Sequence, residues 1–371
     1  HNAMTANTAG GTKNVAIGNY SLDVLTSGDD NVAVGYISLS ANTTGSNNTA
    51  LGSWSLTANT TGVSNTAVGT DSMDSNTDGN YNVAVGADAL QANSTGHRNV
   101  AIGHTALNDN TVSDNIGIGQ QAGYSITTGT RNIAIGTNAL DDTDTENDNL
   151  AIGYNAMTTN TAGGIQNVAV GNYALDALTS GDNCVAIGHG ALGGNTTAES
   201  NVAIGSGAGS DVTTAQTGVY IGLNTNPGDG TTSNNAIVIG SNFTGGGNTF
   251  SFGKGSNVVS NVFTSNATFA RNSDLHKKTN IESTDLGLSF INELRPVTFN
   301  WKPNNEFPKH YDDYSETNNM TTDINLYGMI AQEVETALDK VGHKNFGGWS
   351  EEEDGSQKLA QSMFIYPLIN A

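Results

Sequence analysis

The chain is poor in several residue types on which other proteins depend for stability or binding. It has one cysteine, Cys184, so no disulfide can form within the chain and no cysteine-based zinc site exists. It has 13 Lys and Arg against 35 Asp and Glu, a net charge of −22. Such a surface repels phosphate backbones, so nucleic acid is not an expected partner. No apolar run approaches the ~18 residues of a membrane span, so we expect no membrane insertion.

Glycine is abundant, with 46 residues, and much of it lies in a repeat. The motif N-[VIT]-[AG]-[IVL]-G recurs with a step of 17 residues, with one step of 16 and two of 18. The fourteen motif glycines are Gly18, Gly35, Gly52, Gly69, Gly86, Gly103, Gly119, Gly136, Gly153, Gly171, Gly188, Gly205, Gly222 and Gly240. Four residues after the glycine comes Leu or Met in ten of the first twelve copies, and a polar turn follows. Such self-similarity is typical of solenoids.

A unit of 17 residues is too short for a helix pair and fits two short strands and two turns, so the pattern predicts a parallel β-solenoid of fourteen coils. In V-A-I-G, Val and Ile point to one face and Ala and Gly to the other. We expect the large residues to fill the coil interior, and the small face to allow close approach by another chain. The motif Asn, replaced by Cys184 in copy eleven, is expected to stack into a structural ladder.

Residues 4–31 match residues 157–184 at 20 of 28 positions, an offset of nine repeats. We therefore expect an array that is truncated at its N-terminus, with an upstream virion or fibre component as a partner. The repeat motif resembles the head repeats of YadA-type trimeric adhesins, and similar repeats occur in phage tail fibres. The resemblance covers about residues 14–240 and implies a homotrimer of left-handed β-rolls.

The period is lost after residue 240. Residues 241–272, with strand-like "NTFSFG" and "NVVSNVF", predict a β-rich neck. Residues 273–371 hold four of the five prolines and predict a small α+β domain. A helix is expected over about 285–294, a strand at "VTFNW", a helix or strand–helix ending at Gly342, and a last helix in "SQKLAQSMFIYPLINA". The predicted domains are thus 1–240, 241–272 and 273–371.

Residues 273–371 resemble the C-terminal intramolecular chaperone of phage endosialidases and tailspikes, a self-cleaving peptidase domain. The likeness lies in "SDLHKKTNI", "GLSFINELRPVTFNW", "YGMIAQEVE" and "AQSMFIYPLINA". The resemblance implies a Ser273–Lys278 dyad that cuts the Asn272–Ser273 bond. Asp274, His276 and Asn280 complete the motif, with His276 in place of the usual Arg.

The dyad is chemically coherent, because a serine hydroxyl needs a base and a lysine serves as one only when burial or a nearby cation lowers its pKa. Lys277 or His276 is a candidate for that cation. Taken alone, a Ser and a Lys five residues apart are more often two surface residues. A Ser273/Asp274/His276 triad is disfavoured, because near neighbours in sequence rarely converge.

These features favour a segment of a trimeric phage tail fibre or tailspike, located in the virion, that attaches to a host glycan or protein receptor. The alternatives are a bacterial surface adhesin, which would be extracellular or on the cell surface, and the fibre of a contractile injection system. A glycan depolymerase is less favoured, since the array carboxylates lie in variable turns. We expect no cofactor and no metal, because the Asp clusters lack calcium-motif spacing.

Overall fold

The structure is a computed structural model that describes residues 3–5, 10–160, 163–262, 270–271, 279–311, 313–318, 322–344 and 346–371. The chain divides into two compact units, residues 1–272 and residues 273–371. Each unit is described by itself below.

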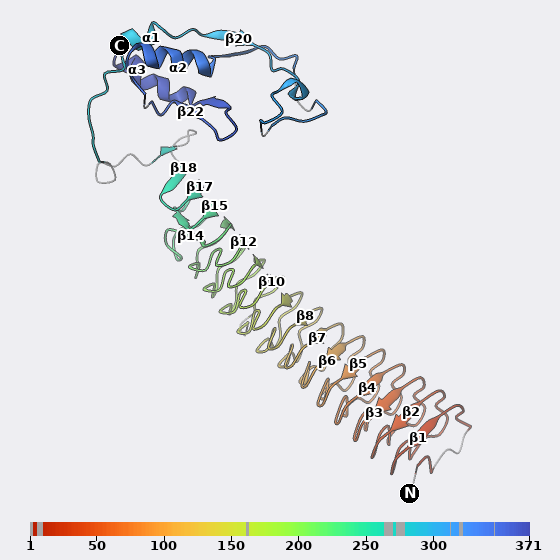
Figure 1. Cartoon of the computed structure of the whole chain (residues 1–371). Coiled ribbons are helices and arrows are strands. Elements are labelled where there is room, and N and C mark those ends of the chain that lie inside the picture. The colour runs from red at the N-terminus through yellow and green to blue at the C-terminus, as the bar shows by residue number, and fades with distance from the viewer. Residues whose placement is uncertain are drawn as a thin grey trace. The chain divides into compact units, whose positions relative to one another are not determined.

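The first unit is a parallel β-solenoid of fourteen coils, as predicted (Figure 1). Each coil contributes one short strand, and neighbouring strands pair in parallel and in register, so that Val32 lies beside Thr49 and Ala33 beside Ala50. The strands are β1 (Val15–Ile17), β2 (Val32–Val34), β3 (Thr49–Leu51), β4 (Thr66–Val68), β5 (Val83–Val85), β6 (Val100–Ile102), β7 (Ile116–Ile118), β8 (Ile133–Ile135), β9 (Leu150–Ile152), β10 (Val168–Val170), β11 (Val185–Ile187), β12 (Val202–Ile204), β13 (Val219–Ile221) and β15 (Ile237–Ser241).

The expectation of two strands per coil was wrong for the body of the array. Among the described residues, a second parallel ladder occurs only at its end, between β14 (Thr225–Pro227) and β16 (Phe243–Gly245). Elsewhere the rest of each coil is a chain of turns, whose backbone groups bond to the next coil; Leu39 N–H, for example, donates to Ser55 O at 3.0 Å. Stacking identical coils satisfies these groups without a regular strand.

The predicted orientation of the strands was also wrong. The central residue of each strand, alanine in most coils, points inward and is buried from Ala33 onwards, whereas the flanking residues, mostly Val and Ile, point outward. Two further inward positions are the Leu or Met four residues after the motif glycine, such as Leu39, and the Ser or Ala that precedes this Leu or Met, such as Ser38. The apolar interior is therefore built from small strand residues and large turn residues.

The narrowness of the coil explains this arrangement. At position 117 a glycine replaces the alanine, and a Cβ there would lie 2.8 Å from Leu107 Cγ and 2.7 Å from the carbonyl oxygen of Ala122. Real Cβ contacts are not so close, and even one methyl group there would force its neighbours to shift. A Val or Ile pointing inward would collide with the Leu that enters from the opposite turn.

The expected asparagine ladder is confirmed. The side-chain Oδ1 of each motif Asn accepts a hydrogen bond from the backbone N–H of the next one, as in Asn48 N–H to Asn31 Oδ1 at 3.0 Å. Its Nδ2 donates to a turn carbonyl one coil further on, as in Asn48 to Gly62 O at 2.8 Å. These asparagines are almost completely buried, so each one satisfies polar groups that water cannot reach.

The motif glycine is required by the stacking of the coils. Gly35 has a φ of +146°, and a Cβ there would overlap the backbone carbonyl of Gly52 in the next coil. The same close approach recurs along the array, which explains why glycine occupies this position in every copy.

The array ends in a modified coil. Tyr220 takes the inward position that alanine occupies elsewhere and is fully buried, with room provided by Gly209 and Gly218. Burial raises the pKa of its hydroxyl to about 12. Beyond β15, the strand β17 (Thr249–Lys254) pairs in parallel with it, then turns back as an antiparallel hairpin with β18 (Asn257–Val262), and β19 (Ala270–Arg271) follows. The two strand predictions for the neck are thus confirmed.

The second unit contains short helices and two small antiparallel ladders. Its elements are α1 (Leu288–Ile291), β20 (Val297–Phe299), the 3-10 helix η2 (Asn304–Glu306), β21 (Leu326–Gly328), α2 (Ala331–Lys340), β22 (Trp349–Glu351), β23 (Gln357–Leu359), the 3-10 helix η3 (Gln361–Phe364) and α3 (Ile365–Ile369). The first helix is shorter than predicted, and the last predicted helix begins as strand β23. The strand–helix interpretation before Gly342 is confirmed. No helix in the described part of the chain is long and apolar enough to cross a bilayer.

Candidate functional site

The outward side chains of the strands form an aliphatic face along the array. We define this aliphatic face as the first and third residues of β1–β13 and of the Ile237–Ile239 triplet in β15. Exposure along it reaches 60% at Ile17 and 48% at Leu51. Other members that remain more than a third exposed are Val15, Ile102, Ile187, Ile204, Ile221 and Ile239.

The aliphatic face is large for a solvent-facing surface. Fourteen strands spaced ~4.8 Å apart, with three residues each at ~3.3 Å, cover on the order of 600 Å². Contiguous apolar patches of this size mark interaction surfaces. It is also flat and regular, because the strands pair in register, so its chemistry suits a partner with the same repeat.

The position of the aliphatic face was missed from the sequence, although a signal was present. From β2 to β12 the inward strand position is always Ala or Gly, whereas the outward positions vary among Val, Ile, Thr and Leu. A position that tolerates different sizes is not confined by its neighbours, whereas one restricted to Ala or Gly is.

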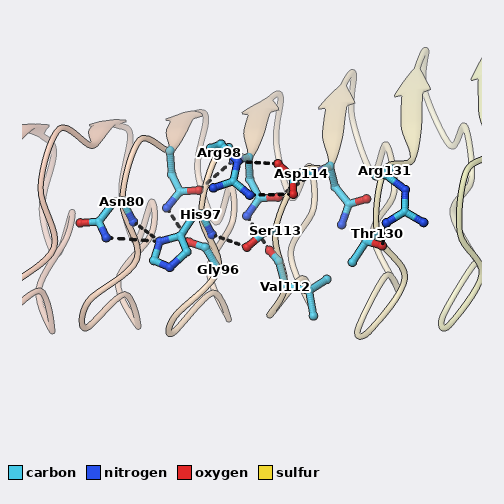
Figure 2. A network of polar contacts seen from close by, with 12 residues as sticks. Asn80, Gly96, His97, Arg98, Val112, Ser113, Asp114, Thr130 and Arg131 are labelled. Carbon is cyan, nitrogen blue, oxygen red and sulfur yellow. Dashed lines mark hydrogen bonds and ion pairs between the residues drawn. The ribbon is translucent and has the colours of Figure 1, made fainter.

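The corner turns before the strands carry a second polar network, shown in Figure 2. The side chain two residues before the motif Asn often accepts a hydrogen bond from the backbone N–H of the preceding coil. Asn80 N–H donates to His97 Nδ1 at 2.9 Å, and His97 N–H donates to Ser113 Oγ at 2.9 Å. His97 is therefore an acceptor at Nδ1, and this column of short polar side chains has a structural role.

Charged residues in the adjacent column pair between coils. Arg98 Nε lies 2.7 Å from Asp114 Oδ1, and Arg131 Nε lies 2.5 Å from Asp148 Oδ1. The hydrogen bond from Arg98 lowers the pKa of the Asp114 carboxyl, and the hydrogen bond from Arg131 lowers that of Asp148. Both pairs are largely exposed, so they add little to stability at physiological salt.

The second unit has a small aromatic core. Phe290 of α1 is fully buried, with ring centroids 5.6 Å from Phe346 and 6.2 Å from Phe364. The C-terminal residues contact the segment that precedes α1, because Asn370 Nδ2 donates to Thr284 O at 3.0 Å and to Leu286 O at 3.1 Å. The described part of this unit is thus closed by residues from both of its ends.

Large apolar side chains also lie on the surface of this unit. Leu288 of α1 and Ile365, Leu368 and Ile369 of α3 are between 53% and 76% exposed. Beside them is a groove of about 450 Å³, lined by Ile291, Leu294, Pro296, Met329, Gln361, Phe364, Ile365 and Leu368. A surface of this kind is typical of a protein-binding face.

The predicted cleavage segment lies almost entirely outside the described residues. Asn272, Ser273, Asp274, His276 and Lys278 all lie outside the described residues. Asn280 is described: it is exposed and adopts a φ of +52°, a left-handed conformation that asparagine tolerates. The described residues hold no group of three or more side chains that could bind a metal ion.

Comparison with known proteins identifies one part of the chain. Residues 273–343 match the protein family described as "Chaperone of endosialidase". No curated protein and no solved structure matches the chain. The chain therefore carries an endosialidase chaperone domain at residues 273–343, preceded by a β-solenoid body.

Proposed function

We propose that this chain is a segment of a homotrimeric phage tail fibre or tailspike that attaches to the host surface. The observation that carries the proposal is the combination of an endosialidase chaperone domain with a β-solenoid whose aliphatic face is exposed. A bacterial surface adhesin or a contractile-injection-system fibre remains the alternative assignment, since such a fibre would also have to bury its aliphatic face and align its copies.

In this proposal the aliphatic face is the interface between the three copies. Each copy offers the same repeat at the same spacing, so Val and Ile side chains of one chain meet those of the others at every coil. Burial is worth about 25 cal/mol per Å² of apolar surface, so a face on the order of 600 Å² per chain is a strong driving force for assembly. A lone chain would leave this face in water.

The chaperone domain supplies the step that the array cannot perform efficiently. In-register association of three long arrays must choose one register among many that differ by whole coils, and such non-local pairing is slow and prone to aggregation. A C-terminal domain that trimerises first would align the chains at one end. The exposed apolar side chains of α1 and α3 are the candidate contacts between copies of this domain.

Solution mass measurement tests the trimer. We expect the full chain to elute with three times its monomer mass in size-exclusion chromatography with light scattering. The double variant Ile118→Asn/Ile135→Asn places amides on the aliphatic face and should yield monomers or aggregates. Thr44→Asn, on an exposed turn, is the matched control and should leave a trimer. A wild-type monomer would contradict the proposal.

Self-cleavage between Asn272 and Ser273 is a separate part of the proposal. The Ser273 hydroxyl would attack the carbonyl carbon of Asn272 while neutral Lys278 takes its proton. The Asn272–Ser273 C–N bond would then break, with Lys278 returning the proton to the Ser273 amine, and water would hydrolyse the resulting Asn272–Oγ ester to release two chains. Denatured mass spectrometry of fresh protein beside a Ser273→Ala variant tests it. Two fragments in the wild type and one intact chain in the variant are the expected result. Intact chains in both the wild type and the variant would show that the domain is not cleaved off and stays attached.

Attachment is tested by binding of fluorescently labelled protein to a panel of bacterial cells. Binding to a subset of strains supports attachment to a host receptor, and absence of binding to all strains argues for a spacer role. Shortening of a capsular polysaccharide by the purified protein would instead support the depolymerase.

A further inference from the structure

The turns of the array carry two groups of exposed aromatic rings. The N-terminal cluster is Tyr20, Tyr36 and Trp54, whose successive ring centroids lie 6.3 Å and 5.5 Å apart. The C-terminal cluster is Tyr154, Tyr173 and His189, with centroids 5.5 Å and 5.7 Å apart. The tyrosine and tryptophan side chains are 37–44% exposed, and His189 is exposed as well. Each cluster therefore forms an edge-to-face row across three successive coils.

The coil itself does not require aromatic residues there. The rings occupy the first and second positions after the motif glycine, where other coils carry small or polar residues such as Asp88, Asn138 and Gly207. Tyr20, Trp54 and Tyr173 have φ values of +62°, +64° and +59°. Glycine and asparagine adopt this conformation most readily, and bulky side chains are unfavourable in it. Exposed rings at these positions therefore point to a role outside the folding of the array.

The dimensions and the polar neighbours of the rows suit a sugar chain. Coils stack at ~4.8 Å, so three of them span roughly 10 Å, which accommodates two to three sugar units. Pyranose rings stack their C–H faces on aromatic rings, and their hydroxyls bond to carboxylates. Asp23 and Asp176 occur in the same coils as Tyr20 and Tyr173. The carboxylate of Asp176 lies near the backbone of Tyr173, because a Cβ on Gly193 would be 3.2 Å from Asp176 Oδ1 and 3.6 Å from the backbone oxygen of Tyr173.

The charges of the array indicate the kind of sugar. Its Lys and Arg residues in the described ranges up to residue 240 are Lys13, Arg98 and Arg131, and each pairs with an aspartate of the next coil. The clusters thus combine rings and carboxylates with no unpaired Lys or Arg of the array to hold an anion. A neutral oligosaccharide fits this chemistry, whereas an acidic one would be repelled.

We propose that the two aromatic clusters are binding sites for a neutral oligosaccharide. The inference rests on the proposed attachment function, because it names the receptor class. Tyr20 and Tyr173 are equivalent in the internal duplication, nine coils or roughly 43 Å apart. One chain therefore offers two similar sites, and a polysaccharide long enough to reach both is bound with avidity.

The test uses the full chain on an array of immobilised neutral oligosaccharides, with polysialic acid as the acidic probe. The variants are Tyr20→Asn/Trp54→Asn, Tyr173→Asn and all three together. They replace each ring by a residue that the same column carries elsewhere and that tolerates its backbone conformation. Tyr81→Asn is the matched control, because Tyr81 is 62% exposed, has a φ of +60° and belongs to neither cluster.

We expect wild type and Tyr81→Asn to bind neutral oligosaccharides equally, each cluster variant to bind at least tenfold more weakly, and the triple variant not to bind. Trp54, the single tryptophan of residues 1–272, should change its fluorescence with the bound sugar, and this change should vanish in Tyr20→Asn/Trp54→Asn. Circular dichroism and solution mass should be unchanged in every variant.

Four further outcomes either overturn the inference or separate it from the proposed attachment function. If the triple variant binds bacterial cells as well as the wild type does, the proposed attachment function stands but the aromatic clusters are not the binding sites. Binding of polysialic acid alone, or of nothing on the array, would exclude a neutral oligosaccharide. A smaller solution mass in the cluster variants would assign the rings to contacts between copies of the chain. Wild type that binds the array but no cells would support the clusters and count against host attachment.

Discussion

The two units of this chain bury their apolar surface in different ways. In the array, the inward side chains of most coils, from Leu22 to Val238, are fully buried, and the remaining large aliphatic residues are gathered mainly on one flat face. In the C-terminal unit, the core is small, and residues such as Ile365 and Ile369 of α3 remain more than half exposed. Each coil of the array thus has a fully buried apolar interior of its own, whereas the core of the C-terminal unit depends on a few aromatic contacts.

This difference predicts two kinds of response to mutation. A solenoid is stabilised by contacts within each coil and with its two neighbours, so damage in one coil is felt locally. A compact unit with one small core loses its cooperative structure when a central residue is removed. The following predictions test that contrast.

The largest effect is expected for Phe290→Ala. This ring contacts Phe346 and Phe364 at the centre of the C-terminal core, and removal of a buried Phe costs about 3–5 kcal/mol. We expect the unfolding transition of the C-terminal unit to move to much lower temperature in calorimetry. The array shares no core residue with the C-terminal unit, so its unfolding temperature should not change in protein that has already assembled. Loss of both transitions would show that the two units unfold together.

Ala134→Leu tests the narrow interior of the coil. Ala134 is fully buried at the inward position of β8, and overpacking a core costs about 1–3 kcal/mol. Ile135→Leu is the matched control, because it keeps its volume and points outward. Chemical denaturation should show a loss of stability for the inward change that exceeds that of the control. Equal effects would mean that the interior has room which the packing does not suggest.

Cys184→Asn should stabilise the array. Cys184 interrupts the asparagine ladder, where its thiol, whose pKa is raised by burial, lies 3.3 Å from Ala198 O. An asparagine would donate to that carbonyl, as Asn201 does to Ala215 O at 2.9 Å, and would accept from the N–H of Asn201. A gain of about 1 kcal/mol is expected from exchanging a weak sulfur partner for amide hydrogen bonds. No gain in denaturation midpoint would indicate that the sulfur already serves as well.

The smallest effect concerns the pairs Arg98–Asp114 and Arg131–Asp148. Each aspartate has a pKa below its usual value when folded, so its stabilisation is present above the unfolded pKa of ~3.9 and is lost as pH falls through the folded pKa. Burial raises the pKa values of Asp141 and Asp176, which act in the opposite direction. We therefore expect Arg98→Gln/Arg131→Gln to lower the melting temperature slightly at pH 7 and by less at pH 2. An equal decrease at both pH values would assign the effect to packing.

Much of this architecture follows from sequence patterns. The period of 17 residues predicts the solenoid and its fourteen coils, and the repeated Asn predicts a ladder, because the same side chain recurs wherever identical coils stack. The likeness of residues 273–343 to endosialidase chaperones is likewise visible in the motifs. The dyad of Ser273 and Lys278 stays a prediction, since both lie outside the described residues.

Other features depend on three-dimensional packing. The alternation in V-A-I-G predicts that the two faces of the strand differ in side-chain size, but it does not determine which face lies inside the coil. The interior volume decides this, since at Gly117 even a Cβ would lie 2.8 Å from Cγ of Leu107, which enters from the opposite turn. The aromatic clusters likewise form only because stacking brings together rings that are 16 to 19 residues apart in the chain. Sequence by itself determined the repeat and the residues that every coil needs; the tertiary structure decided which side chains fill the coil and which face outward, because that choice depends on the space between turns.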